Sequence, residues 1–287
     1  MACMEVTLVE PYGYCYGVLK AIEAAERARQ EDPEKPIYCL GRLVHNEKAV
    51  SELAEKGVFT LVESSPDLGP LLNDAQKGST ILFSAHGHES RLESLCLPLG
   101  LSYIDAACPY VKANAALGKA KLGRVAYIGA KGHAECFAFL KNVCPIAFFD
   151  VKEGKLTAYK EGKPLGAIAQ TTLSEVEIES GLSVLRARYG EMRLLAGRCP
   201  ETIRRQKEVK EALKKADCLL VLGSNTSSNS RKLLELALSS GTPAYLALGL
   251  EEVKRLDLSP YRRLALCSGA STSKQEVLRC RDYLLSL

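Results

Sequence analysis

The sequence of 287 residues has no tryptophan, only three methionines and four histidines, and 6% aromatic residues. It also has no block of basic residues, and its 38 lysines and arginines nearly balance its 34 aspartates and glutamates. Binding to nucleic acid or to an anionic membrane surface requires clustered positive charge, in many cases with aromatic residues interleaved. The composition therefore argues against both kinds of partner.

Long apolar runs are missing as well. No stretch approaches the roughly 18 apolar residues that span a bilayer, and the N-terminal segment "MACMEVTLVEPYG" lacks the charged region and apolar run of a signal peptide. A hydrophobic content of 47% and a charged content of 25% are typical of an ordinary globular protein. The sequence thus predicts a cytoplasmic protein.

Cysteine, in contrast, is plentiful, with eleven residues. None of them forms a C-x-x-C pair, which argues against a simple zinc ribbon or a thioredoxin-like site. The cytoplasm disfavours structural disulfides. Four cysteines lie in apolar runs or on an apolar helix face, and we expect them to be buried as small hydrophobic side chains: Cys39, Cys218, Cys267 and Cys280.

Strand-length apolar segments alternate with helix-length segments along the chain. Strands are expected, for example, within residues 36–40 and 217–223, and helices within residues 174–190 and 201–216. This alternation predicts an α/β fold with mainly parallel sheets flanked by helices.

Polar and reactive residues follow many of the predicted strands. Because parallel α/β sheets bind ligands beyond the carboxyl ends of their strands, this pattern predicts a shared site. The residues that begin these loops are His45, His86, Cys108, His133, Thr171, Ser227 and Ser271.

Three cysteines, Cys15, Cys108 and Cys199, are separated by about a third of the chain each. Each lies near the start of a predicted helix, where the helix dipole favours a thiolate. Three thiolates suit a zinc ion with a water ligand, or an iron–sulfur cube with one iron lacking a protein ligand. The spacing does not decide between these sites, nor does it exclude three unconnected buried cysteines.

The same spacing suits three α/β units. We expect domains at residues 15–107, 108–198 and 199–287, with a strand within residues 1–14 joining the third.

Two further segments are chemically suggestive. In "GHAE", Glu135 lies two residues after His133, so one loop offers a hydrogen-bond donor and an acid. In "VLGSNTSSNSRK", residues 221–232, the polar row suits either a linker or a pocket that holds an oxyanion with neutral donors. Thr226 and Ser230 are candidates to cap or to start the helix that follows.

Taken together, these segments resemble the 4-hydroxy-3-methylbut-2-enyl diphosphate reductase family (LytB/IspH). The matching pieces follow the family's order from near residue 6 to near residue 280, and the ordered set is highly specific. They are "GYCYGV", "LVHN", "FSAHG", "DAACPYVK", "GHAE", "QTTLS", "RRQ", "GSNTSSNS" and "SGAST".

The resemblance implies a trefoil of three small α/β domains around a central cavity. It implies a [4Fe–4S] cluster held by Cys15, Cys108 and Cys199, and an external electron donor such as ferredoxin or flavodoxin. It further implies reductive removal of the allylic hydroxyl from (E)-4-hydroxy-3-methylbut-2-enyl diphosphate. The products would be isopentenyl and dimethylallyl diphosphate, in the non-mevalonate route to isoprenoids.

The resemblance also implies roles for individual residues. Glu135 matches the acid that delivers a proton, and Thr171 matches a position near the substrate hydroxyl, with Thr172 beside it. The positions that match the diphosphate-binding residues are His45, His86, His133, Ser227, Ser228, Asn229 and Ser271.

The sequence departs from the family pattern at Ala107, where the family usually has threonine, and at Arg204, where it often has asparagine. Two alternatives therefore stand beside the main prediction: a divergent member that reduces another allylic alcohol or diphosphate, and a non-catalytic cluster-binding sensor. A nucleotide-binding α/β protein would need a Gly-rich phosphate loop, and the chain has neither a P-loop nor G-x-G-x-x-G.

Overall fold

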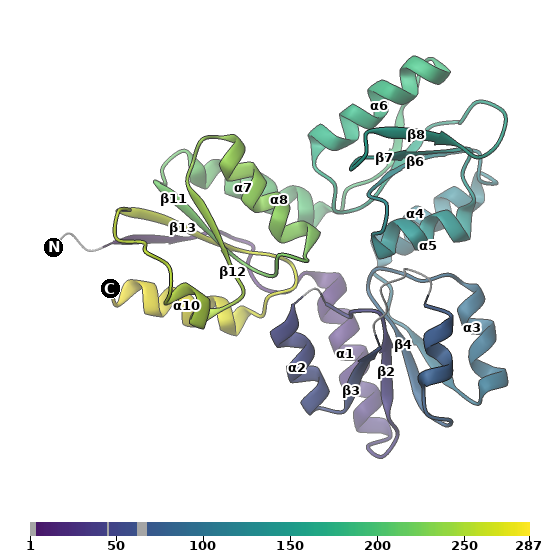
Figure 1. Cartoon of the computed structure of the whole chain (residues 1–287), viewed down its shortest axis with the longest axis horizontal. Coiled ribbons are helices and arrows are strands. Elements are labelled where there is room, and N and C mark those ends of the chain that lie inside the picture. The colour runs from purple at the N-terminus through teal and green to yellow at the C-terminus, as the bar shows by residue number, and fades with distance from the viewer. Residues whose placement is uncertain (1–3, 45, 62–67) are drawn as a thin grey trace. The chain divides into compact units, whose positions relative to one another are not determined.

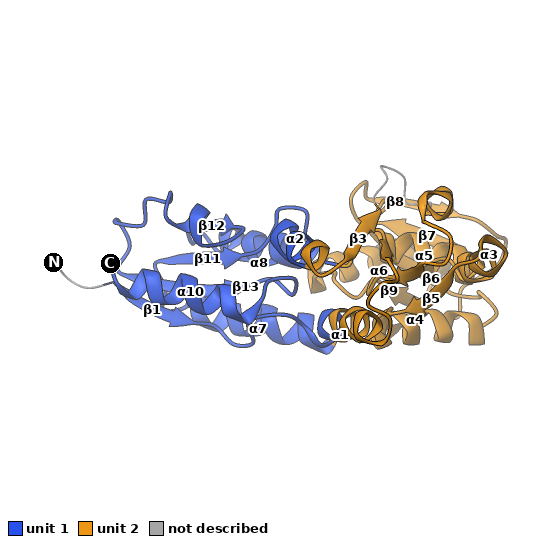
Figure 2. Ribbon diagram, turned by 90° about the horizontal axis from the view of Figure 1, so that it is seen from below, with its two compact units in different colours: residues 1–19, 44–52, 200–287 blue, residues 20–43, 53–199 orange. Residues whose placement is uncertain are grey.

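The computed structural model of the protein describes residues 4–44, 46–61 and 68–287. Over these residues the chain alternates strands and helices (Figure 1) and forms three sheets. Contacts divide it into two compact units (Figure 2): unit 1, with residues 1–19, 44–52 and 200–287, and unit 2, with residues 20–43 and 53–199. Among the described helices, none combines the length and the apolar character that a membrane span requires.

Unit 1 contains one sheet of four parallel strands in the order β1-β13-β11-β12. Side chains alternate between its two faces, so Leu219 and Val221 pack under α7 and α8, whereas Leu220 and Leu222 pack under α9 and α10. The strands are β1 (Glu5–Leu8), β11 (Cys218–Leu222), β12 (Ala244–Ala247) and β13 (Arg263–Ser268). The helices are α7 (Pro200–Leu213), α8 (Ser228–Ser239), α9 (Leu250–Val253) and α10 (Lys274–Leu285).

The first sheet of unit 2 has four parallel strands in the order β3-β2-β4-β5. Leu92 of α3 and Leu72 of the short helix η1 pack against Ile81 and Phe83 of its strand β4. The strands are β2 (Ile37–Leu40), β3 (Val58–Leu61), β4 (Thr80–Phe83) and β5 (Ser102–Asp105). The short helices are η1 (Pro70–Asp74), α3 (Arg91–Cys96) and η2 (Leu97–Leu99), while α1 (Tyr16–Glu31) and α2 (Glu47–Glu55) have residues in both units.

The second sheet of unit 2 has the order β10-β9-β6-β7-β8, and only β8 runs antiparallel to its neighbour. Tyr127 and Ile168 face α4 and α5, and Ile128 and Ala169 face α6. The strands are β6 (Ala126–Gly129), β7 (Ala147–Asp150), β8 (Lys155–Ala158), β9 (Ala167–Ala169) and β10 (Leu194–Ala196). The helices are α4 (Pro109–Ala120), α5 (Ala134–Val143) and α6 (Glu175–Tyr189).

The predicted α/β class with mainly parallel sheets is confirmed, as is the burial of Cys39, Cys218, Cys267 and Cys280. The division into domains at residues 15–107, 108–198 and 199–287 stays a prediction. Each of the three sheets draws its strands from one of these segments, apart from β1, which pairs with β13.

One buried cation ties the loops of unit 1 together. The guanidinium of Arg205 on α7 is 2% exposed, and it donates to the carbonyl oxygens of Gly13 at 2.8 Å and Ser268 at 3.0 Å. It also pairs with the carboxylate of Glu201 at 2.8 Å. A planar guanidinium with five donors can satisfy all these acceptors at once. Arg205 therefore fixes the turn that leads to Cys15 and the end of β13.

We expect Arg205→Met to lower the free energy of unfolding by about 2–4 kcal/mol, because it leaves two buried carbonyls and a carboxylate without their donor. Arg204→Met, at the exposed neighbouring position, is the matched control and should change it by less than about 0.5 kcal/mol. Urea denaturation followed by circular dichroism measures both. Equal effects of the two variants would contradict this role for Arg205.

Candidate functional site

In two of the three sheets, two adjacent central strands are followed by helices that cover opposite faces of the sheet. In unit 1, β11 leads into α8 and β13 leads into α10, and these helices cover opposite faces of the sheet. In unit 2, β6 leads into α5 and β9 into α6, again on opposite faces. Such switch points leave a crevice at the carboxyl ends of the strands. Apart from Cys15, which follows β1, and Cys199, which follows β10, the predicted site residues of these two sheets follow these four strands.

In unit 1, the polar row after β11 is a strand-to-helix turn. Ser227 has extended dihedral angles, and its hydroxyl accepts a hydrogen bond from the backbone N–H of Ser230 at 3.3 Å. Ser227 is therefore the N-cap of α8, so neither Thr226 nor Ser230 caps this helix, although Ser230 lies in its first turn, as one of the two expected roles requires. The hydroxyl of Ser227 accepts with its oxygen, so its own hydrogen can still be donated to a ligand.

The first turn of α8 presents neutral donors. The side chain of Asn229 is 7% exposed, and its amide nitrogen has no hydrogen-bond partner among the described residues. Ser228 precedes it, Ser271 is buried in the loop after β13, and the first turn of α8 carries no acidic residue. A helix N-terminus with orphan backbone N–H groups and a buried amide donor is suited to an anion.

Two glycines allow the loops of unit 1 to close on this turn. A methyl group on Gly223 or on Gly269 would overlap with the hydroxyl oxygen of Ser230. The loops after β11 and β13 therefore both approach the start of α8 more closely than a side chain permits. This close approach gathers Ser227, Asn229 and the loop of Ser271 in one region of unit 1.

In unit 2, Glu135 is buried at the start of α5 and held by Thr171 from the loop after β9. The carboxylate is 3% exposed, and it accepts hydrogen bonds from the Thr171 backbone N–H at 2.8 Å and hydroxyl at 2.6 Å. Burial raises the pKa of Glu135 to about 7, although the two bonds from Thr171 act in the opposite direction. A carboxylic acid with a pKa near neutrality is the usual property of a general acid.

His133 lies next to this acid, and His86 lies next to His133. His133 is the N-cap of α5, and its Nδ1 accepts from the backbone N–H of Glu135 at 3.2 Å, so the neutral ring carries its hydrogen on Nε2. The ring of His86, from the loop after β4, lies edge-on to that of His133 with 5.7 Å between centroids. His45 lies outside the described residues.

Gln170, a residue that sequence reasoning missed, connects the two loops of this crevice. Its side-chain oxygen accepts from the backbone N–H of Ala130 at 2.9 Å, and its side-chain nitrogen donates to the Thr172 hydroxyl at 2.8 Å. The side chain is fully buried. In the sequence, a polar residue at the end of a strand gives no sign of which loop it contacts.

The three cysteines singled out by their spacing differ from the other described cysteines. Cys108 is the N-cap of α4, Cys15 immediately precedes α1, and Cys199 immediately precedes α7. All three are half-buried, whereas the remaining described cysteines are fully buried, apart from the exposed Cys144. Burial raises the thiol pKa to about 12 at five of the buried positions, which makes them poor ligands: Cys39, Cys136, Cys218, Cys267 and Cys280.

The backbone of these cysteines is well fixed. The N–H of Cys15 donates to the carbonyl of Ala270 in unit 1, and in unit 2 the N–H of Cys199 donates to the carbonyl of Thr171 at 3.1 Å. Cys15 belongs to unit 1, and Cys108 and Cys199 belong to unit 2. Over its described residues, neither unit by itself gathers three or more His, Cys, Asp or Glu side chains at metal-binding distance.

Comparison with known proteins identifies the family. A family model described as LytB protein matches residues 6–285. The 4-hydroxy-3-methylbut-2-enyl diphosphate reductase of Symbiobacterium thermophilum is 33% identical over 277 residues, covering 94% of this chain and 92% of the relative. That of Bacillus subtilis is 33% identical over 286 residues, covering 96% and 90%.

A solved structure agrees with these relatives. The structure of the E-1-hydroxy-2-methyl-but-2-enyl-4-diphosphate reductase from Plasmodium falciparum superimposes with a TM-score of 0.85 at 25% identity, covering 98% of this chain and 88% of that one. Because the family model matches nearly the whole chain, and the relatives are matched along most of their own lengths, this chain belongs to the LytB protein family.

Proposed function

We propose that this protein is an iron–sulfur oxidoreductase of isoprenoid biosynthesis, a 4-hydroxy-3-methylbut-2-enyl diphosphate reductase. The substrate would take up two electrons and two protons and lose its allylic hydroxyl as water, giving isopentenyl or dimethylallyl diphosphate. The relatives that carry this name support the proposal. The observation that carries it is the buried Glu135 carboxyl on the hydroxyl of Thr171, because loss of hydroxide from carbon requires a proton donor.

Three cysteines are the proposed ligands of a [4Fe–4S] cluster: Cys15, Cys108 and Cys199. They fit such a group because each half-buried thiol precedes a helix, whose dipole favours the thiolate that iron requires. The buried thiols elsewhere do not fit it. When bound, a cluster with three protein ligands supplies electrons singly and an iron site open to the substrate oxygen.

Glu135 and Thr171 would deliver the first proton. The backbone N–H of Thr171 occupies Oε1, so the acid form of Glu135 carries its hydrogen on Oε2 and donates to the Thr171 hydroxyl oxygen. The Thr171 hydroxyl is then able to donate its own hydrogen to the substrate oxygen. A proton thus moves from Oε2 through this hydroxyl to the leaving group, and Glu135 is left as a carboxylate.

Neutral donors would hold the diphosphate. In unit 1 these are the hydroxyls of Ser227, Ser228 and Ser271, the amide of Asn229 and the orphan N–H groups of α8. We propose that His45, His86, His133 and Thr172 contribute further donors. Hydroxyl, amide and imidazole groups bind an anion without bringing a fixed charge that would hold the product too tightly.

The electron source is an external one-electron donor, and we propose a ferredoxin or flavodoxin. The described cysteines are all thiols, which suits a reducing compartment, and we propose that the enzyme works in the cytoplasm.

Anaerobic reconstitution followed by a turnover assay tests the proposal. We expect about four irons and four sulfides per chain, and conversion of the hydroxy-diphosphate to the two C5 diphosphates when a reductant is present. Glu135→Gln should lower kcat by about 10²–10⁴-fold without changing the absorption spectrum of the cluster, because it removes only the acid.

Glu153→Gln is the matched control, since Glu153 is exposed and pairs with Lys131 on the surface. It should leave kcat unchanged. A protein that stays free of iron would sink the cluster assignment. A full cluster without turnover would instead favour a sensor or a reductase for another allylic substrate.

The pH dependence of kcat should report the ionisation of Glu135. Because the acid form is the active one, kcat should be constant below the pKa of about 7 and fall tenfold per pH unit above it. The Thr171 hydroxyl lowers the pKa of Glu135, so in Thr171→Val the fall of kcat should begin at a higher pH, and kcat itself should be reduced. If kcat of Thr171→Val begins to fall at the same pH as that of the wild type, the ionising group is not Glu135.

The anion site can be tested by adding one negative charge. Asn229→Asp keeps the size of the side chain but replaces a buried donor with a carboxylate, so KM should rise more than about tenfold, with kcat changed less. Asn225→Asp, at an exposed position in the same loop, should leave KM within about twofold. Similar KM values for the two variants would place the diphosphate elsewhere.

A further inference from the structure

Unit 2 also contains a cavity of about 190 Å³, which has no part in the proposed function described above. Its walls come from α4 and α5 and from the segments after β4 and β5, and it has room for several water molecules. Val111, Ala115, Ala138 and Phe139 line its interior, and Glu135 is also part of the wall.

The cavity extends from the protein surface to the buried acid. Lys112 and Lys119 of α4 line it and are exposed, whereas Glu135 lines it and is 3% exposed. Thr171, which would carry the proton onward to substrate, is not among the described residues that line it. Glu135 therefore both forms a hydrogen bond with the Thr171 hydroxyl and is part of the cavity wall.

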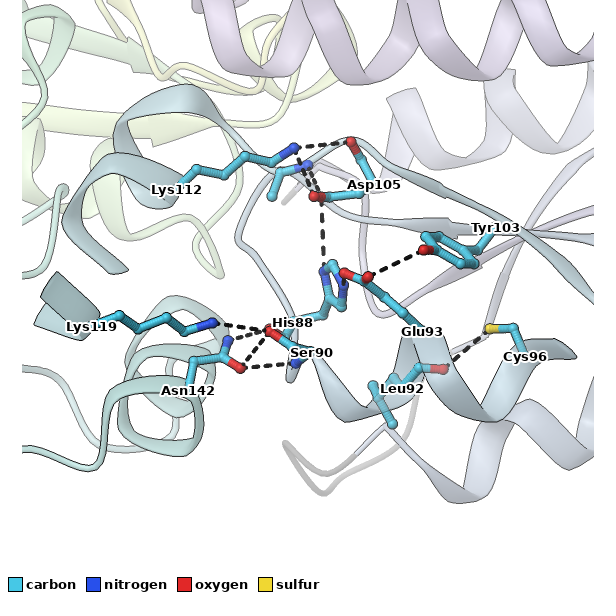
Figure 3. A network of polar contacts seen from close by, with 11 residues as sticks. His88, Ser90, Leu92, Glu93, Cys96, Tyr103, Asp105, Lys112, Lys119 and Asn142 are labelled. Atoms are coloured by element: carbon cyan, nitrogen blue, oxygen red, sulfur yellow. Dashed lines mark hydrogen bonds and ion pairs between the residues drawn. The ribbon is translucent and has the colours of Figure 1, made fainter. Parts of the chain in front are cut away.

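Several titratable residues that line the cavity form a network of polar contacts (Figure 3). The ring of His88 donates or accepts through Nε2 at 2.9 Å from the carboxylate of Glu93, and its Nδ1 lies 3.9 Å from that of Asp105. Lys112 pairs with Asp105 at 2.7 Å, and Lys119 lies 3.4 Å from the hydroxyl of Ser90. Both carboxylates are about a third exposed, so this cluster can exchange protons with solvent.

The proposed reaction requires such a supply. Each turnover takes one proton from Glu135 and leaves a carboxylate that is shielded from bulk water. A proton must return to Oε1 or Oε2 before the next substrate reacts, and the Thr171 side of the carboxyl is occupied by two hydrogen bonds.

We propose that this cavity is the proton inlet of the enzyme, in which water carries protons from the cluster around His88 to Glu135. The inference rests on the proposed function of Glu135 as the acid. It adds a water-filled path and the residues of α4 and α5 that keep it open.

Ala115→Leu tests the inlet, because Ala115 is a half-buried cavity residue on α4 and leucine would fill the space with carbon atoms. Ala113→Leu is the matched control, exposed on the same helix and outside the cavity lining. The first readout is the hydrogen–deuterium exchange of the Glu135 carboxyl in the holoenzyme, followed by infrared spectroscopy after mixing with heavy water. Glu135→Gln identifies the band.

We expect exchange in Ala115→Leu to be at least about tenfold slower than in the wild type, because the leucine side chain would displace the water molecules from the cavity. Exchange in Ala113→Leu should match the wild type. Equal exchange rates in all three proteins would overturn the inlet. Should Ala115→Leu fail to fold, Ala116→Leu lies on the same wall at an exposed position that tolerates added volume.

The second readout is kinetic. In Ala115→Leu the first turnover of reduced holoenzyme should keep its rate, since the proton is already on Glu135, whereas steady-state kcat should fall about tenfold with an increased solvent isotope effect. A first turnover slowed as much as kcat would mean a structural effect and would overturn the proposal. If the wild-type holoenzyme does not convert the substrate, the proposed function fails, and the exchange measurement still decides whether the cavity supplies Glu135.

Discussion

Parallel strand pairing is the constraint on which the candidate site depends. Parallel neighbours place all their carboxyl ends at one edge of a sheet, and the connecting helices must cross over its faces. At the edge between β6 and β9, residues far apart in the chain meet, so Glu135 and Thr171 form two hydrogen bonds across 36 positions of sequence. In unit 1 the same constraint brings the loops after β11 and β13 onto the first turn of α8.

The alternation of apolar and helical segments was enough to predict the sheets, because parallel strands buried on both faces are continuous apolar runs. Two strands lacked this signal. β8 and β10 lie at the edges of their sheet, and all their residues are at least partly exposed; β8 reads KLTA, and the apolar stretch LLA of β10 is only three residues long. Such a strand forms because it pairs with a neighbouring strand, and a short sequence segment contains no information about that neighbour.

From the sequence, the candidate site could be proposed as a set of residues but not as an arrangement. The resemblance gave Glu135, Thr171 and the serine row, whereas the structure gives the burial of the carboxyl and the choice of Ser227 as helix cap. Seven neighbouring small polar residues look interchangeable in sequence, and only the backbone angles decide which hydroxyl meets an orphan N–H. Arg205 belongs to the matching "RRQ" segment, but its burial and its acceptors from Gly13 and Ser268 could not be predicted, since an arginine in a charged helical segment looks like a surface residue.

The environment of Glu135 balances two opposing effects. Burial alone favours the neutral acid so strongly that it would give up its proton only with difficulty, and the two donors of Thr171 stabilise the carboxylate enough to bring the pKa to about 7. A group so balanced can both release and regain a proton at neutral pH. In the proposed reaction, Thr171 would receive the proton and would also stabilise the carboxylate that forms. The same burial that tunes the acid keeps its carboxyl away from bulk solvent, so the proposed reaction requires a second route for protons besides the side that Thr171 occupies, and the cavity beside Glu135 is the proposed route.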